Sequence, residues 1–191
     1  DFRDNFAVEI WEALGHGDEP ALLATTEIPV ALLVLLAVGL IFLVRGNRLA
    51  LGVIHGMMFT GGMVISLSTL FFANGMLGSI PWMIALGVGL HLAYVPYGCV
   101  LFDRLLAATG SIGTSVFMIY VVDAMGYLGS IGLMLFRSLA QPDLPWLRFY
   151  MELSQIVGAI MMLGFALSGA WFLKQTRKEE PEARGARSAQ T

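Results

Sequence analysis

Long apolar runs separated by short polar links dominate the pattern of this chain. A helix that spans a bilayer needs roughly 20 mostly apolar residues. Five runs approach or exceed that length, at residues 28–44, 49–73, 79–102, 112–136 and 151–173. The runs are continuous and do not alternate at every second residue, which excludes a transmembrane β-barrel. The pattern therefore predicts an all-α fold, a polytopic transmembrane bundle of about five spanning helices.

The first 27 residues follow a different pattern. Phe2, Phe6, Ile10 and Leu14 recur at four-residue intervals, which is typical of an amphipathic helix. The stretch GHGDEP then interrupts the helix. We expect residues 1–27 to form an amphipathic outer helix end followed by a loop. We also expect the chain to begin partway through a longer protein.

Composition supports a membrane protein and charge predicts its orientation. Of the 191 residues, 57% are hydrophobic and only 13% are charged, against about 25% charged in soluble domains. If the C-terminus is cytoplasmic, basic residues are concentrated on that side, as the positive-inside rule requires. The cytoplasmic set is then Arg45, Arg48, Arg104, Lys174, Arg177, Lys178, Arg184 and Arg187, and the outer set is Arg3, Arg137 and Arg148. We predict a multi-pass protein of the bacterial inner membrane, with residues 174–191 as a disordered cytoplasmic tail.

Asp123 lies deep inside the fourth run. Tyr120, Asp123 and Tyr127 follow the spacing i, i+3, i+7 and share one helix face. A carboxylate near the bilayer centre costs from about 2.5 kcal/mol upward, so Asp123 must face protein or a water-filled cavity. The functional hypothesis is a proton or substrate pathway formed by these three residues. The alternative is a structural hydrogen bond to a neighbouring helix.

His91 and Tyr94 share a face of the third run, just before Pro96. A proline inside a helix removes one backbone hydrogen bond and favours a kink. An imidazole can carry a proton near neutral pH, so His91 and Tyr94 are candidate substrate contacts. A buried histidine with a purely structural hydrogen bond is the alternative. Tyr97 lies round the helix from His91 and is a secondary candidate.

Three further polar residues are secondary candidates. His55 lies in the second run, but its predicted depth differs from that of His91 by several ångströms, at about 1.5 Å of rise per residue. We therefore expect no haem between the two histidines and no other cofactor. Glu152 and Gln155 open the fifth run one turn apart, and Arg148 is spaced to pair with Glu152.

Motifs of soluble enzymes are missing from the sequence. There is no glycine-rich phosphate loop, no Cys/His metal cluster and no serine elbow. Cys99 is the single cysteine and lies in an apolar run, where such a residue usually packs as a small apolar group. We expect neither an enzyme nor a metal site, and no nucleic-acid partner.

The stretches DFRDNF, VPYGCVLFDRLLA and DAMGYLGSIG resemble a bacterial family of carrier-like proteins of unknown function. The order of five spans after an outer helix end resembles the C-terminal half of the major facilitator superfamily. That resemblance implies that residues 1–14 end helix seven and that the five runs are helices eight to twelve. It also implies that His91 and Tyr94 line a central cavity, and that the Asp123 face meets the first half of the carrier. The first six helices and most of the seventh are not in this chain.

These observations lead to one functional hypothesis and two alternatives. We expect the C-terminal half of a secondary active transporter that moves a small solute, with Asp123 as the candidate proton-linked residue. Its expected partners are the lipid bilayer, the N-terminal half of the same transporter and a small-molecule substrate. One alternative is a small, non-transporting membrane subunit or assembly partner that uses Asp123 to bind a basic residue of another helix. The other is a membrane haem protein.

Overall fold

The computed structural model describes residues 3, 6–110, 112–140 and 145–188, and these residues form helices without any strand. The described elements are α2 (Ala7–Ala13), α3 (Ala21–Ile41), α4 (Asn47–Ala73), α5 (Ser79–Pro96), the π-helix η1 (Tyr97–Leu101), α6 (Phe102–Thr109), α7 (Ser115–Ala140) and α8 (Trp146–Ser188). Five helical segments of this part of the chain are long and apolar enough to cross a membrane. The predicted all-α, polytopic bundle is confirmed.

Helix boundaries differ most from the sequence prediction at three places. The first candidate span begins at Ala21 instead of residue 28, so Glu27 lies inside it. The third continues through η1 and α6 to Thr109. The sequence favoured disorder from Lys174 onward, whereas α8 continues as helix to Ser188. Lys, Arg, Glu and Ala are strong helix formers, which suits an extension of a helix that is already nucleated.

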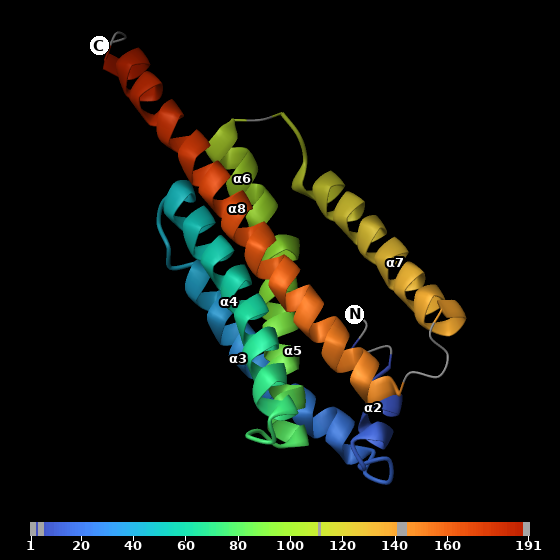
Figure 1. Cartoon of the computed structure of the whole chain (residues 1–191). Coiled ribbons are helices and arrows are strands. Elements are labelled where there is room, and N and C mark those ends of the chain that lie inside the picture. Colours follow the sequence, from blue (N-terminus) through green and yellow to red (C-terminus); the bar gives the residue numbers. More distant parts are fainter. Residues whose placement is uncertain (1–2, 4–5, 111, 141–144, 189–191) are drawn as a thin grey trace.

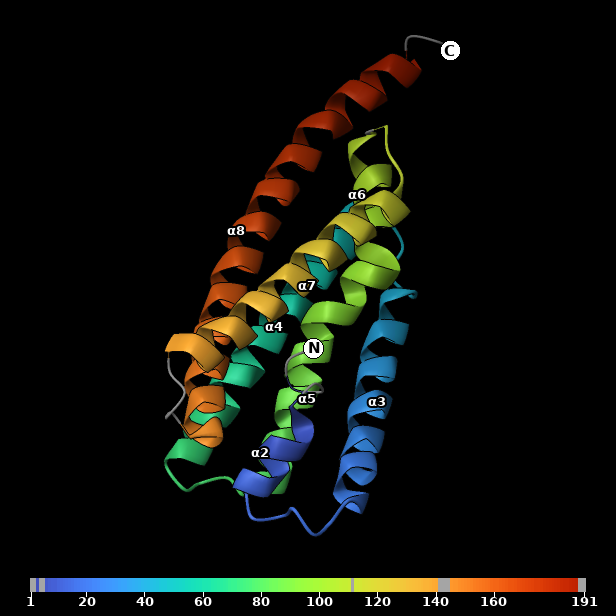
Figure 2. The ribbon, with the colours of Figure 1, turned by 90° about the vertical axis from the view of Figure 1, so that its right-hand side faces the viewer.

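Successive long helices run antiparallel, so each end of the bundle gathers a defined set of helix termini (Figures 1 and 2). At one end, here called the α2 end, α3, α5 and α8 begin and α4 and α7 finish. At the opposite end, here called the α6 end, α4 and α7 begin. Helix α4 packs most extensively against α8 and α5, and α5 also packs against α3.

Glycines allow α4 to approach both neighbours closely. A Cβ atom on Gly61 would lie 2.5 Å from the carbonyl oxygen of Gly89 in α5. One on Gly62 would lie 2.9 Å from the carbonyl oxygen of Gly158 in α8. Helix association in lipid relies on small residues at such contacts, because lipid itself supplies little hydrophobic driving force. These contacts make α4 the centre of the bundle.

An aromatic cluster closes the α2 end. The indole of Trp82 is fully buried, stacks on Phe72 with ring centroids 4.0 Å apart, and donates to Thr69 Oγ1 at 3.2 Å. Ile10 and Trp11 of α2 are buried in the same cluster. The apolar stripe of α2 therefore docks this helix on the bundle (Figure 2), and Arg3 lies against α5 at Gly87.

Helix α7 is peripheral. None of its described residues is buried, and Figure 1 shows it set to one side of the other long helices. Its contacts are chiefly with α6. Asp123 lies about two turns after Ser115, in the half of this helix that faces the α6 end and about one turn before its middle.

Candidate functional site

Asp123 has a hydrogen-bond partner on the neighbouring helix. The hydroxyl of Tyr97 donates to Asp123 Oδ1 at 2.8 Å. This contact bridges the otherwise loosely packed α7 and the α5–η1 segment. The Asp123 carboxylate lies inside a candidate span and thus accepts a hydrogen bond from a neutral donor. This contact agrees with the hypothesis of a proton or substrate pathway and with the alternative of a structural hydrogen bond.

The position of Tyr97 follows from Pro96. Proline has no backbone N–H and cannot continue the ordinary hydrogen-bond ladder of a helix. The chain widens into the π-helix η1 immediately afterwards, with Tyr97 as its first residue. Short π-helical turns within α-helices are frequent at functional sites. Tyr97 was expected to be a secondary candidate because helical spacing places it round the helix from His91; in the structure Tyr97 is the residue that contacts Asp123.

Aromatic neighbours orient the Tyr97 ring. Tyr94 packs edge-on against it with centroids 5.0 Å apart and an interplanar angle of 85°. Phe102 lies at 6.2 Å in a second edge-on contact. Such contacts restrict the ring and hold its hydroxyl toward α7. Tyr94 itself is 58% exposed, so its role here is to support Tyr97.

The two tyrosines expected beside Asp123 lie apart from it. The side chains of Tyr120 and Tyr127 are 70% and 73% exposed. Neither forms a hydrogen bond to Asp123 in the described part of the chain. Sharing one face of a helix does not by itself bring two side chains into contact, and among the described residues only Asp123 of the three forms a hydrogen bond with the neighbouring segment. Both residues therefore belong to the exposed surface of α7.

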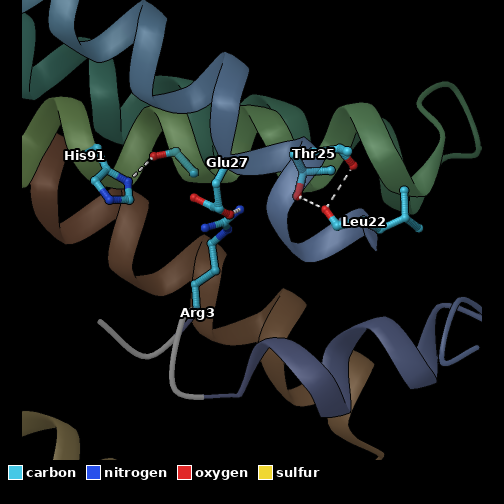
Figure 3. A network of polar contacts seen from close by, with 7 residues as sticks. Arg3, Leu22, Thr25, Glu27 and His91 are labelled. Carbon is cyan, nitrogen blue, oxygen red and sulfur yellow. Dashed lines mark hydrogen bonds and ion pairs between the residues drawn. The ribbon is translucent and has the colours of Figure 1, made fainter. Parts of the chain in front are cut away.

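His91 is bonded within its own helix. Its Nδ1 atom lies 2.8 Å from the carbonyl oxygen of Gly87, one turn earlier. A carbonyl only accepts, so Nδ1 carries the proton of this bond and Nε2 is the acceptor in the neutral ring. The imidazole is partly buried on the α5 face that includes Gly87 (Figure 3).

An ion pair that the sequence analysis missed lies beside Gly87. Arg3 Nη2 donates to Glu27 Oε1 at 2.5 Å (Figure 3). The Arg3 side chain is 2% exposed and that of Glu27 is 46% exposed. A Cβ on Gly87 would lie 3.1 Å from Arg3 Cζ. The guanidinium therefore rests directly on the α5 backbone, at a place that only glycine leaves open.

The placement of Arg3 differs from the sequence prediction, which counted it among the outer loop residues. One available signal was its register. Arg3 precedes Ala7 by one turn and Ile10 by two, so it lies on the stripe that buries α2. Because that stripe docks on the bundle, Arg3 is carried in with it.

His55 connects α4 to α8. It is 5% exposed, with Nδ1 2.8 Å from the Leu51 carbonyl oxygen and Nε2 3.2 Å from Ser168 Oγ. Both ring nitrogens thus have protein partners. In the described part of the chain, no group of three His, Cys, Asp or Glu side chains is placed to hold a metal ion.

Glu152 and Gln155 have structural contacts. Glu152 Oε1 accepts from Arg148 Nε at 2.9 Å, as the spacing predicted, and both side chains are exposed. Gln155 Nε2 donates to the backbone carbonyl of Ser66 at 2.9 Å, and so joins α8 to α4. Neither residue contacts Asp123, His91 or Arg3 among the described interactions.

A cavity of about 610 Å³ lies away from all of these residues. It is open, and its lining comes from the start of α4 and from α8: Gly46, Asn47, Arg48, Leu49, Gly52 and Leu173. None of the candidate site residues that the sequence predicted lines this cavity.

The fold and these buried polar contacts define a multi-pass, α-helical membrane protein. The chain belongs to the family described as "Family of unknown function (DUF5690)", whose model matches residues 1–175. The resemblance to a family of unknown function is therefore confirmed. No curated protein and no solved structure matches the chain.

Proposed function

We propose that this chain is the C-terminal part of a secondary active transporter that moves a small solute across the bacterial inner membrane. The observation that supports this most is the Tyr97–Asp123 hydrogen bond between two candidate spans. Ionisable residues inside membrane spans are usually functional, because their desolvation is costly. In this proposal Asp123 is the proton-linked residue and Tyr97 is its hydrogen-bond partner.

The chemistry of the pair suits proton loading and release. A phenolic hydroxyl both donates and accepts hydrogen bonds. It can therefore stay bonded to Asp123 when the carboxyl is ionised and when it is protonated. The bond to the ionised form is charge-assisted and stronger. Protonation would weaken the bridge between η1 and α7, and so loosen the helix that has the fewest contacts.

The exposed surface of α7 supports the idea that this chain is one part of a larger carrier. Transporters of this type rock one bundle of helices against another around a central site. An unburied helix that carries a satisfied carboxyl is a suitable moving contact between two such bundles. The sequence resembles the C-terminal half of a major facilitator carrier. That resemblance implies that the α7 face with Asp123 meets the first half of the carrier.

The charge distribution supports a cytoplasmic C-terminus more strongly once Arg3 is placed inside the bundle. The outer helix ends then hold Arg137 and Arg148, against the eight basic residues expected on the opposite side. The positive-inside rule counts loop residues near the ends of spans. Removal of Arg3 from that count therefore increases the asymmetry.

A non-transporting membrane subunit is the second candidate. The unburied surface of α7 also suits an assembly contact with another protein. In that case Asp123 would bind a partner helix, and no solute would cross the membrane. Transport measurements separate the two proposals.

The test is uptake by proteoliposomes that contain the complete carrier, with and without an imposed pH gradient. Asp123→Asn keeps the shape of the side chain and removes its titration, so gradient-driven uptake should fall at least about tenfold, the lower range for loss of acid–base chemistry. Tyr97→Phe should reduce it less, since the carboxyl remains. Asp18→Asn is the matched control, because that carboxyl is exposed in the loop before α3 and lies outside the candidate spans. Driven uptake at the wild-type level in Asp123→Asn would remove Asp123 from the mechanism.

A further inference from the structure

Arg3 is a charged side chain held inside the bundle at the α2 end. Its guanidinium rests on α5 at Gly87, about two turns after Ser79, and Glu27 lies about one and a half turns into α3. Val30, on the next turn of α3, is buried against the same glycine. The arginine is therefore set between two candidate spans and among apolar side chains.

Stability alone does not explain an ion pair at this place. Burial of two charges carries a desolvation cost that their attraction often fails to offset, and apolar side chains of similar volume commonly pack as well or better. Retention of a guanidinium that is 2% exposed is more readily explained by a use for its charge. There is no Lys or Arg in the five apolar runs, at residues 28–44, 49–73, 79–102, 112–136 and 151–173. The fold adds Arg3, which precedes α2 in the chain.

The two members of the pair differ in access. Arg3 is fixed against backbone and is buried, whereas Glu27 is nearly half exposed. Its flexible side chain can therefore turn away without crossing the packed interior. When the Glu27 side chain turns away, a carboxylate oxygen of another molecule can take the place of Glu27 Oε1 beside Arg3 Nη2.

We propose that Arg3 is the anion-binding group of this bundle and that it takes a small monocarboxylate solute in exchange for the Glu27 carboxylate. Guanidinium groups match carboxylate geometry and form charge-assisted hydrogen bonds with it. One monocarboxylate replaces another, so the charge beside Arg3 is unchanged. A dianion such as phosphate would add a surplus negative charge next to Glu27. This inference names the substrate class of the transporter proposed above and rests on that function.

His91 extends the same surface. It lies one turn beyond Gly87 on α5, and Tyr94 and Tyr97 follow on the next turns. Arg3 and Asp123 thus contact the same α5–η1 segment, Arg3 at Gly87 and Asp123 at Tyr97. These two positions are about 15 Å apart at 1.5 Å per residue, and His91 and Tyr94 lie between them in sequence. The anion site and the proposed proton site are separate, so each can be tested without the other.

The test measures binding to the purified chain in lipid nanodiscs. The probes are the straight-chain acids from acetate to hexanoate, each compared with its uncharged amide, and the readout is the melting temperature as a function of probe concentration. At least one acid should stabilise the protein where its amide does not. Arg3→Gln should weaken that binding at least about tenfold, as loss of a charge-assisted hydrogen bond predicts.

Further variants separate binding from folding. Glu27→Gln removes the competing charge and should bind the acid as tightly as wild type or more tightly. Arg3→Lys keeps the positive charge but lacks the planar guanidinium group. This variant should keep the fold and bind the acid more weakly than wild type. Arg148→Gln is the matched control, because it removes an arginine from an exposed ion pair and should leave binding unchanged.

The outcomes that would overturn the proposal are distinct from those that would overturn transport. The site is wrong if no acid stabilises the protein more than its amide, if inorganic phosphate binds in preference, or if binding survives Arg3→Gln and Arg3→Lys unchanged. Acid binding without uptake by proteoliposomes would instead keep the site and contradict transport. Uptake that is insensitive to Arg3→Lys would keep transport and contradict the site.

Discussion

At the scale of single residues, three polar contacts inside this bundle join residues that are distant in sequence. Asp123 accepts from Tyr97, Glu27 accepts from Arg3, and the Trp82 indole donates to Thr69. Burial of a polar group without such a partner is costly. These contacts therefore specify which helices lie beside one another, in addition to whatever chemistry they support.

Gly87 gives a prediction at this scale. A Cβ at this position would lie 2.8 Å from Val30 Cγ2 and 3.1 Å from Arg3 Cζ, so Gly87→Ala should displace both. Overpacking of this kind typically costs about 1–3 kcal/mol. We expect a lower melting temperature in detergent and weaker binding of any acid that occupies Arg3. Gly129→Ala is the control, since a Cβ there meets nothing within 4 Å; equal effects in the two variants would contradict the packing described here.

At the scale of helices, α4 and α7 represent two extremes. Helix α4 is in close backbone contact with α5 and α8, whereas α7 has no buried residue among those described. Both are apolar enough to span a membrane. Hydropathy alone therefore does not distinguish a helix that forms the centre of the bundle from one that is left at its edge. The glycine contacts and the hydrogen bonds make that distinction.

Gly61 tests the α4–α5 contact. Gly61→Ala would place a Cβ 2.5 Å from the Gly89 carbonyl oxygen, and backbone cannot move aside as a flexible side chain can. We expect a loss of about 1–3 kcal/mol of stability, seen as a lower melting temperature in detergent. Gly56→Ala, also in α4, meets nothing within 4 Å and should be neutral or slightly stabilising because alanine favours helix. A neutral Gly61→Ala would show that the two helices are not in this close contact.

At the scale of the whole molecule, the antiparallel order gives the loops alternating sides. The loop between α4 and α5 and the first turn of α8 share the α2 end, and the C-terminal part of α8 extends beyond the α6 end (Figure 1). The cytoplasmic side proposed for the C-terminus then fixes the side of each loop. The orientation is a single binary choice that one labelling experiment resolves.

That experiment labels single cysteines on intact cells with an impermeant maleimide. Cys99 is exposed and is first replaced by alanine. Met76→Cys, in the loop between α4 and α5, should then react, because Met76 is 73% exposed and the loop is outside by the proposed orientation. Ser188→Cys should react only after the cells are opened. The opposite pattern would reverse the orientation.

The sequence by itself determined the class of protein and its helices. Continuous apolar runs of spanning length can form little but helices, since every backbone group in lipid needs an internal partner. The apolar stripe of α2 was equally visible, because its period is local. The Arg148–Glu152 pair followed from spacing within one helix for the same reason.

Only the tertiary structure decided which polar residues meet. The i, i+3, i+7 spacing placed Tyr120 and Tyr127 with Asp123 on one face, yet both tyrosines are exposed. The contact instead comes from Tyr97, whose direction depends on the π-helical turn after Pro96. Arg3 enters the bundle because α2 docks beside α5. Helical periodicity fixes directions within one helix, whereas contacts between helices depend on packing, rotation and local distortion that no single period encodes.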